Sequence, residues 1–140
     1  MTLEELNRYF DLVNSLQKTQ ELLVKFRNAA LPGAQVLTGM PHSSGITDLI
    51  GDLAVEIADL TAREEYILSE IAIHREAVDA YVANIEDSYL MMMFRLRFQR
   101  GLTFKAIASI LGGGNSEDSV KSAVYRYINK NENSLPDDAS

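Results

Sequence analysis

The sequence contains no cysteine and only two histidines. Without cysteine the chain cannot form a disulfide or hold a metal ion through thiolates. His42 and His74 lie in unrelated sequence contexts, and two histidines alone do not complete a zinc site. We therefore expect neither a metal ion nor any other cofactor.

Long hydrophobic runs are also missing. No stretch approaches the roughly 20 apolar residues that a membrane-spanning helix needs. The first residues, Met-Thr-Leu-Glu-Glu-Leu, have neither the basic start nor the apolar centre of a secretion signal. We expect no membrane partner and a location in the cytoplasm.

The sequence contains no recognisable catalytic motif. No plausible nucleophile and base pair and no cluster of metal ligands is present. The one glycine-rich stretch, residues 112–115, lacks the Gly-Lys-Ser/Thr ending of a phosphate-binding loop. We therefore expect a protein that is not an enzyme.

The net charge of −7 is unevenly distributed. Residues 1–83 hold 13 acidic and 6 basic side chains, and the tail at 132–140 has a net charge of −3. Residues 84–131 hold 4 acidic and 7 basic side chains, a net charge of +3. Affinity for phosphates depends on local clusters of positive charge rather than on the total. The segment 84–131 is therefore the candidate for nucleic-acid binding.

A first helix is predicted from Thr2 to about Asn28. Thr2 and Glu5 have the spacing of a capping box. Apolar residues at helical spacing follow, namely Leu6, Tyr9, Val13, Leu16 and Leu23. Pro32 and Gly33 end this helix because proline cannot continue it. The residues from there to Gly45 are expected to form an irregular loop.

A second and longer helix is predicted over residues 46–85. Its seam recurs in steps of four and three, at Ile46, Ile50, Leu53, Ile57, Leu60, Glu64, Ile67, Ile71, His74, Val78, Tyr81 and Ile85. No glycine or proline interrupts the stretch after Gly51. We interpret the two polar members, Glu64 and His74, as positions that fix the register.

A helix of this length cannot bury its apolar stripe alone. The first helix, folded back on it, covers about two-thirds of the stripe, and the remainder must meet the C-terminal module or a second subunit. We therefore expect an all-α fold, with a long antiparallel, coiled-coil-like helical hairpin over residues 1–83 that forms a homo-oligomer through the long helix. A C-terminal helix-turn-helix bundle over 84–131 and an acidic flexible tail over 132–140 follow.

The pattern of a helix-turn-helix lies in the C-terminal part. Residues 85–100 are densely apolar, and Gly101 ends that helix. Thr103 and Gly112 have the residue types of an N-cap and a C-terminal stop for a short helix. Ala108 lies four residues before Gly112, which is the spacing of a small residue at a close helix crossing followed by a left-handed turn.

A second helix of this unit is predicted from about Ser116 to Lys130. Its buried stripe is expected at Val120, Val124 and Tyr127. We expect Thr103 and Lys105 to contact the DNA backbone. The residues expected to contact backbone or base edges from the second helix are Ser119, Lys121, Ser122, Tyr125, Arg126 and Lys130. Acidic Glu117 and Asp118 at its start oppose this interpretation, because recognition helices usually present their first residues to the bases.

The residues 96–108, Leu-Arg-Phe-Gln-Arg-Gly-Leu-Thr-Phe-Lys-Ala-Ile-Ala, resemble the start of the helix-turn-helix in the promoter-reading fourth region of sigma factors. The wider stretch is similar to small phage and prophage transcriptional regulators of the ArpU/RinA type, through Ile-Glu-Asp at 85–87, Asp-Ser-Val-Lys-Ser at 118–122 and Tyr-Arg-Tyr-Ile at 125–128. The resemblance implies a long helical N-terminal part, a sigma-like module and control of late or packaging genes in a bacterial host. Over residues 1–83 the resemblance is limited to the architecture, a long helical N-terminal part.

One departure from this pattern concerns the turn. In the usual unit an apolar residue follows the turn glycine by six positions, and here that position is Asp118. Val120 comes two residues later, so Gly113 and Gly114 are expected to extend the turn. The recognition helix would then dock at a different angle.

These features favour a phage-derived regulator of transcription that reads the major groove of double-stranded DNA. The hairpin would either dimerise it or contact the host RNA polymerase. Two alternatives stay open. One is a DNA-recognition subunit for genome packaging, similar to a small terminase, and the other is a structural oligomerisation adaptor whose C-terminal bundle binds protein.

Overall fold

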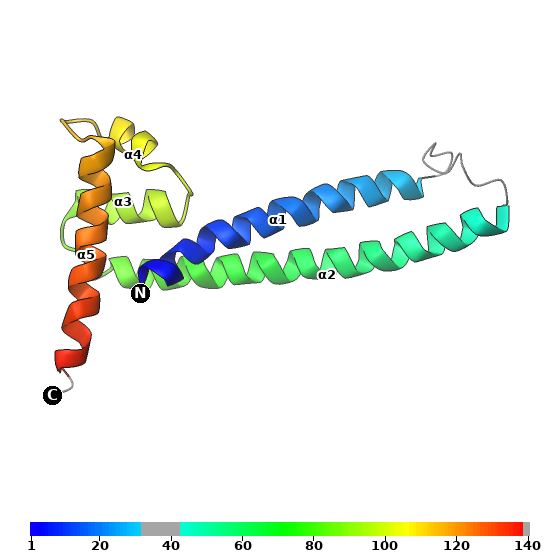
Figure 1. The fold of residues 1–140 in the computed structure, drawn as a ribbon, viewed down its shortest axis with the longest axis horizontal. Helices are drawn as coiled ribbons and strands as arrows, with labels where there is room; N and C mark the ends of the chain where they lie inside the picture. The colour runs from blue at the N-terminus through cyan, green and yellow to red at the C-terminus, as the bar shows by residue number, and fades with distance from the viewer. Residues whose placement is uncertain (32–42, 139–140) are drawn as a thin grey trace. The chain divides into compact units, whose positions relative to one another are not determined.

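The computed structural model is helical throughout the part of the chain that it describes, residues 1–31 and 43–138 (Figure 1). Side chains are described for 1–31 and 48–132. The helices are α1 (Leu3–Ala30), α2 (Ser43–Val82), α3 (Ser88–Phe98), α4 (Phe104–Leu111) and α5 (Glu117–Asp138). The prediction of an all-α fold is confirmed for these residues. Of the helices described, none combines the length and the apolar character that a membrane crossing requires.

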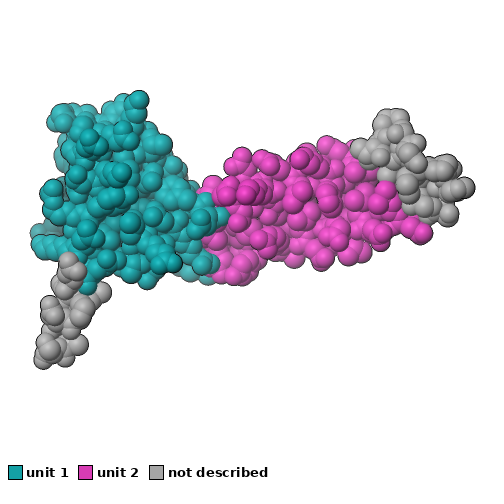
Figure 2. Space-filling model, in the orientation of Figure 1, with its two compact units in different colours: residues 1–11, 71–140 teal, residues 12–70 magenta. Residues whose placement is uncertain are grey.

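Two compact units make up the chain (Figure 2). Unit 1 consists of residues 1–11 and 71–140, and unit 2 consists of residues 12–70. Both α1 and α2 contribute to each unit, whereas α3, α4 and α5 belong to unit 1. The division therefore differs from the boundary after residue 83 that the sequence suggested, because the ends of α1 and α2 group with the C-terminal helices.

The ends of α1 and α2 follow local capping rules. The hydroxyl oxygen of Thr2 accepts a hydrogen bond of 3.1 Å from the backbone N–H of Glu5, as the capping box predicts. Most of the expected loop, residues 32–42, lies outside the described residues. Its last residues, Ser43 to Gly45, already belong to α2, which begins three residues before the predicted Ile46.

In unit 2 the segments of α1 and α2 lie side by side and run in opposite directions (Figure 1). The side-chain amide of Gln20 donates a hydrogen bond of 3.1 Å to the carboxylate of Glu64, so this polar seam position has a partner across the helix pair. Among the side chains of the unit that the structure describes, the buried hydrophobic ones are Leu12, Leu23 and Ile67. Among the seam residues of α2 whose side chains are described, Ile50, Leu53, Ile57 and Leu60 are half-buried or exposed, so the two helices leave part of their apolar stripe open.

The core of unit 1 joins the first turns of α1 and the last turns of α2 to the three C-terminal helices. Its buried members are Leu6, Val78, Val82, Ile85, Met93, Phe94, Phe98, Phe104, Ile107, Ala108, Val120, Val124 and Ile128. Because Leu6 and Val78 are fully buried in the same cluster as Val120 and Val124, the C-terminal helices depend on residues from the start of the chain.

Buried His74 attaches the first turns of α1 to α2. Its Nε2 atom lies 3.1 Å from the carbonyl oxygen of Glu5 and 3.2 Å from that of Leu6. Carbonyl oxygens only accept hydrogen bonds, so Nε2 must carry the proton. The ring is 6% exposed, and the bond joins groups 69 residues apart along the chain.

The long helix ends earlier than the heptad pattern predicts. We expected α2 to continue through Ile85, but it stops at Val82, and this prediction was wrong. The carboxylate of Asp87 accepts hydrogen bonds from the backbone N–H groups of Tyr89 and Leu90, which starts a new helix. Ile85 is nevertheless buried. The seam pattern therefore predicted correctly that this residue is buried, but not that its backbone lies outside the helix.

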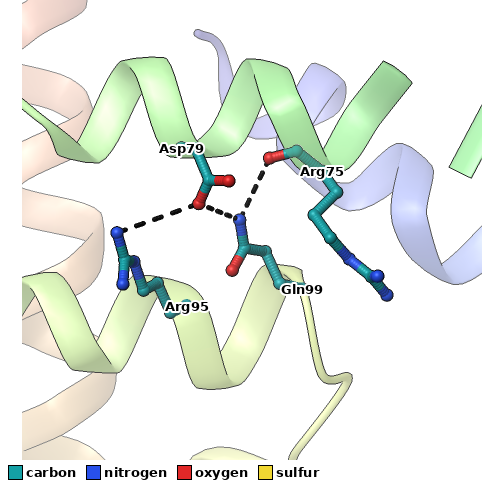
Figure 3. Close-up of polar contacts among 4 residues, drawn as sticks. All are labelled: Arg75, Asp79, Arg95 and Gln99. Atoms are coloured by element: carbon teal, nitrogen blue, oxygen red, sulfur yellow. Dashed lines mark hydrogen bonds and ion pairs between the residues drawn. The ribbon is translucent and has the colours of Figure 1, made fainter. Parts of the chain in front are cut away.

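Polar side chains join α2 to α3 within unit 1 (Figure 3). The amide of Gln99 donates to the carboxylate of Asp79 at 2.7 Å and to the carbonyl oxygen of Arg75 at 3.0 Å. Arg95 approaches the same carboxylate at 3.9 Å. Gln99 is 8% exposed and lies at the C-cap of α3, so its bonds fix where α3 ends against α2.

Candidate nucleic-acid interface

The start of α4 is held in place by Arg97. The guanidinium carbon of Arg97 lies 4.5 Å from the ring centroid of Phe10 and 4.3 Å from that of Phe104. Its Nη1 atom donates a hydrogen bond of 3.0 Å to the carbonyl oxygen of Leu102. Burial lowers the pKa of this guanidinium below its ordinary value. Arg97 therefore serves packing, although it counts among the bases that give this region its positive charge.

The short helix α4 begins as predicted at an N-cap Thr103. The hydroxyl oxygen of Thr103 accepts a hydrogen bond of 3.1 Å from the backbone N–H of Ala106. The cap uses this oxygen as an acceptor and does not consume the hydroxyl proton, which can still be donated to a phosphate. Ile107 and Ala108 are buried, and Lys105 points to solvent on the opposite side.

The turn between α4 and α5 contains three consecutive glycines with positive φ angles. Gly112, Gly113 and Gly114 have φ values of 59°, 61° and 85°. No atom lies within 4 Å of a Cβ built on any of them, so backbone conformation rather than crowding requires glycine here. The side-chain amide of Asn115 donates to the carbonyl oxygen of Gly112 at 2.7 Å and closes the turn.

Two serines cap the start of α5. The hydroxyl of Ser116 accepts from the backbone N–H of Ser119 at 3.1 Å, and the hydroxyl of Ser119 accepts from the backbone N–H of Ser116 at 2.8 Å. The Ser119 hydroxyl also donates to the carbonyl oxygen of Ser116 at 2.9 Å. Ser119 was expected to contact DNA. Its side chain is exposed, but its proton and an acceptor position are engaged in the cap.

One side of α5 is buried much as its sequence predicts. Val120 and Val124 are fully buried, and Ile128 is 1% exposed. Tyr127 is half-buried and packs edge-on against Phe94, with ring centroids 5.5 Å apart. Aliphatic Ile128 and aromatic Tyr127 therefore both contribute to the buried side of α5 at this level of the helix. The helix itself continues to Asp138 and includes most of the segment assigned from sequence to a tail.

Tyr127 also contacts Tyr81 near the end of α2, with ring centroids 5.9 Å apart. The hydroxyl of Tyr81 accepts a hydrogen bond of 3.3 Å from the side-chain amide of Asn131. Burial raises the pKa of the Tyr81 phenol, and the bond from Asn131 opposes that shift. This aromatic contact fixes the middle of α5 against α2 within unit 1.

The opposite side of α5 gathers most of the side chains that the sequence assigned to DNA binding. A shallow depression on it is lined by Lys121, Ser122, Tyr125, Arg126, Asn129 and Lys130. Asn129 is the one member that the sequence analysis left out of its site. Thr103, Lys105 and Ser119 do not line this depression.

Tyr125 is held on this surface by contacts of its ring. Its ring packs edge-on against Phe104, with centroids 5.8 Å apart, and the Lys121 ammonium lies 5.9 Å from the ring centroid. The contact with Phe104 couples α5 to α4, and through Phe104 to Arg97. The Tyr125 ring is thus packed against α4, and its half-buried side chain also lines the depression.

A second and more apolar groove lies between α3 and α5. It is lined by Asp87, Leu90, Met93, Ala123, Arg126, Tyr127 and Lys130. Arg126 and Lys130 border both surfaces. From the sequence, residues 85–100 were described only as densely apolar, and this groove was not predicted. Its signal was that the segment holds more apolar residues than a single buried stripe needs.

Charge separates along α5. Glu117 and Asp118 lie in its first turn, where acidic side chains interact favourably with the helix dipole. Basic Lys121, Arg126 and Lys130 follow over the next turns. These bases can bind phosphates, and the hydroxyl and amide groups between them can hydrogen-bond to base edges. Neither acidic residue lines the depression, although Glu117 lies one helical turn before Lys121 and Asp118 one turn before Ser122.

No protein-family model, curated protein or solved structure matches this chain. Its function is therefore inferred from the residues and their geometry.

Proposed function

We propose that the chain is a transcriptional regulator that binds double-stranded DNA, and that the exposed side of α5, up to Lys130, enters the major groove. The observation that carries this proposal is the surface lined by Lys121, Ser122, Tyr125, Arg126, Asn129 and Lys130. The unit formed by α4, the glycine turn and α5 acts as the helix-turn-helix, and Thr103 and Lys105 add contacts to the phosphate backbone. The resemblance to phage regulators supports a phage origin and control of late or packaging genes.

The chemistry of this surface fits a duplex better than it fits a small ligand. The depression is shallow, so the side of α5 that carries it can enter a groove of its partner. Three cations over ten residues match the repeated negative charge of a DNA backbone. Ser122 and Asn129 offer short polar groups between these cations, and Tyr125 offers a hydroxyl together with an apolar ring.

DNA binding is tested by titrating the full chain against DNA duplexes over a range of salt concentrations. The duplexes are selected for binding from the phage or prophage DNA that neighbours the gene for this chain. Lys121→Ala should weaken binding to all sequences and reduce the slope of log affinity against log salt by roughly one. Arg126→Ala or Tyr125→Phe should cost about 1–3 kcal/mol on the selected site and relax its preference at one base pair.

The matched control is Lys25→Ala, which removes the same charge from an exposed position in unit 2. It should leave both affinity and salt slope unchanged. A folded chain that does not bind DNA at low salt, or that loses equal affinity through Lys25→Ala and Lys121→Ala, contradicts the proposal.

The apolar groove between α3 and α5 favours a second candidate function, that of an adaptor that binds another protein. Leu90, Met93 and Tyr127 supply an apolar surface bordered by Arg126 and Lys130, as in many peptide-binding grooves. This candidate replaces the first if Arg126→Ala leaves DNA affinity intact. A ring-sized assembly that binds DNA would instead favour the packaging subunit.

A further inference from the structure

Side chains from four helices of unit 1 form a continuous series of contacts that ends on the proposed DNA-binding surface. The guanidinium of Arg97, on α3, lies 4.5 Å from the ring centroid of Phe10 on α1 and 4.3 Å from that of Phe104 on α4. The ring of Phe104 meets that of Tyr125 on α5 at 84°, with centroids 5.8 Å apart. Tyr125 in turn lines the depression on α5. The series therefore connects the first turns of α1 with a side chain of the proposed site.

Phe10, at the start of this series, is packed against neighbours from α1 and α3. Its ring forms edge-to-face contacts with those of Tyr9 and Phe98, with centroids 5.6 Å and 6.5 Å away. It also lies behind the connection between α3 and α4, since its Cε1 atom is 3.9 Å from a Cβ built at Gly101. A closely packed ring has little freedom to change its rotamer. Phe10 is therefore a fixed support for the guanidinium of Arg97.

The placement of the Tyr125 ring decides what its hydroxyl can do on a duplex. The hydroxyl can donate or accept a hydrogen bond, and such bonds weaken steeply when distance and angle depart from their optimum. The Lys121 ammonium, 5.9 Å from the centroid of the same ring, has a flexible stem and can bind a phosphate as a point charge. Loss of the contacts behind Tyr125 should therefore reduce base discrimination and leave phosphate binding in place.

We propose that Phe10 is a positioning residue for Tyr125 and thereby sets the base preference of the DNA-binding surface. It acts through Arg97 and Phe104, which lie between the two rings. This inference rests on the proposed function, because base preference exists only if the chain binds DNA. It adds a determinant of specificity in α1, outside the helix-turn-helix. The placement of the Tyr125 ring can be measured without DNA.

Fluorine NMR of the full chain tests the placement of the ring. The six tyrosines are replaced by 3-fluorotyrosine during expression, and the Tyr125 resonance is assigned with Tyr125→Phe. Phe10→Leu should shift this resonance, because the Tyr125 ring then samples other positions. Tyr81→Leu is the matched control. It removes a contact with Tyr127, which lies on nearly the opposite side of α5, and should leave the Tyr125 resonance in place.

Titration of duplexes tests the effect on base preference. Preference is the ratio of affinities for the selected duplex and for one changed at the base pair that Tyr125→Phe relaxes. Partial unfolding lowers both affinities alike and cancels in this ratio. Phe10→Leu should lower the ratio about three- to tenfold and leave the salt slope unchanged, because no phosphate contact is lost. Phe10→Tyr, which keeps a ring at this position, should keep the ratio.

A double variant tests whether Phe10 acts through Tyr125. In a chain that already carries Tyr125→Phe, Phe10→Leu should lower the preference no further. A further loss in this chain overturns the proposal, and so does a Tyr125→Phe variant that relaxes no base pair.

The fluorine spectra separate this inference from the proposed function. A Tyr125 resonance that Phe10→Leu leaves unchanged overturns the positioning role, as does an equal shift from Tyr81→Leu. A wild type that does not bind DNA at low salt contradicts the proposed function instead. The Tyr125 resonance then still decides whether Phe10 positions this ring.

Discussion

At the scale of single residues, the guanidinium of Arg97 is held between the rings of Phe10 and Phe104 and donates to the carbonyl oxygen of Leu102. It thereby joins α1, α3 and α4 within unit 1. A planar cation can stack on two aromatic faces and still donate at its edge, and lysine cannot do both. Positive charge at this position therefore contributes to the fold of the proposed DNA-binding module.

Arg97→Ala should lower the free energy of unfolding by about 2–3 kcal/mol, through loss of two cation–π contacts and a charged hydrogen bond. Arg97→Lys should give an intermediate loss, because it keeps the charge without the planar stacking. Urea unfolding followed by circular dichroism measures both. Arg100→Ala is the control, since Arg100 is exposed, and it should stay within about 0.5 kcal/mol. Equal losses at the two arginines would show that the stacking contributes nothing.

Helical spacing was sufficient to predict which residues share the outer side of α5. Lys121, Tyr125 and Arg126 were assigned to one surface from their spacing, and they line one depression. Spacing could not reveal that the Ser119 hydroxyl is used in a cap, because Ser116 and Ser119 can bond to each other only in the geometry of this turn. Nor could it show that Arg97 faces two rings, one of which is 87 residues away in the sequence.

At the scale of elements, two glycines in different settings should respond oppositely to the same substitution. Gly113 has a φ of 61°, where a Cβ is strained, whereas Gly51 lies within α2 with open space around it. Gly113→Ala should destabilise the protein by about 1–2 kcal/mol. Gly51→Ala should stabilise it by up to about 1 kcal/mol, because alanine has the higher helix propensity.

Thermal unfolding of both alanine variants checks this pair. Opposite shifts of Tm are expected, downward for Gly113→Ala and upward for Gly51→Ala. A rise in Tm for Gly113→Ala would contradict the left-handed geometry of the turn.

The break between α2 and α3 shows that hydrophobic periodicity alone does not predict where a helix ends. The heptad pattern runs through Ile85 because that residue is buried, yet the backbone leaves the helix after Val82. The better signal was Asp87, whose short carboxylate can cap a new helix. Capping residues inside an apolar pattern compete with its continuation, and here the cap prevails.

At the scale of the whole molecule, the first turns of α1 share a core with α5. Leu6 is fully buried in that core, whereas Leu22, on the same helix in unit 2, is 41% exposed. Leu6→Ala should therefore cost about 2–5 kcal/mol. Leu22→Ala, the same chemical change, should cost less than about 1 kcal/mol.

Urea unfolding of the two variants measures these costs, and DNA titration follows their effect on the proposed site. We expect Leu6→Ala to weaken apparent DNA binding once the folded fraction falls, although it lies far from Lys121 in the sequence. Similar stabilities for the two variants would show that the C-terminal helices form their core without the start of the chain. Sequence alone did not suggest this dependence, because contacts between distant segments leave no local periodicity.

The bond from His74 to the carbonyl oxygens of Glu5 and Leu6 also has a kinetic meaning. It closes a loop between groups 69 residues apart, and closing such a loop from an unfolded chain carries an entropic cost that rises with its length. Pairing α1 with α2 in unit 2 first would shorten the loop that remains to be closed and so reduce that cost. We therefore expect the helix pair of unit 2 to form before the first turns of α1 join the core of unit 1.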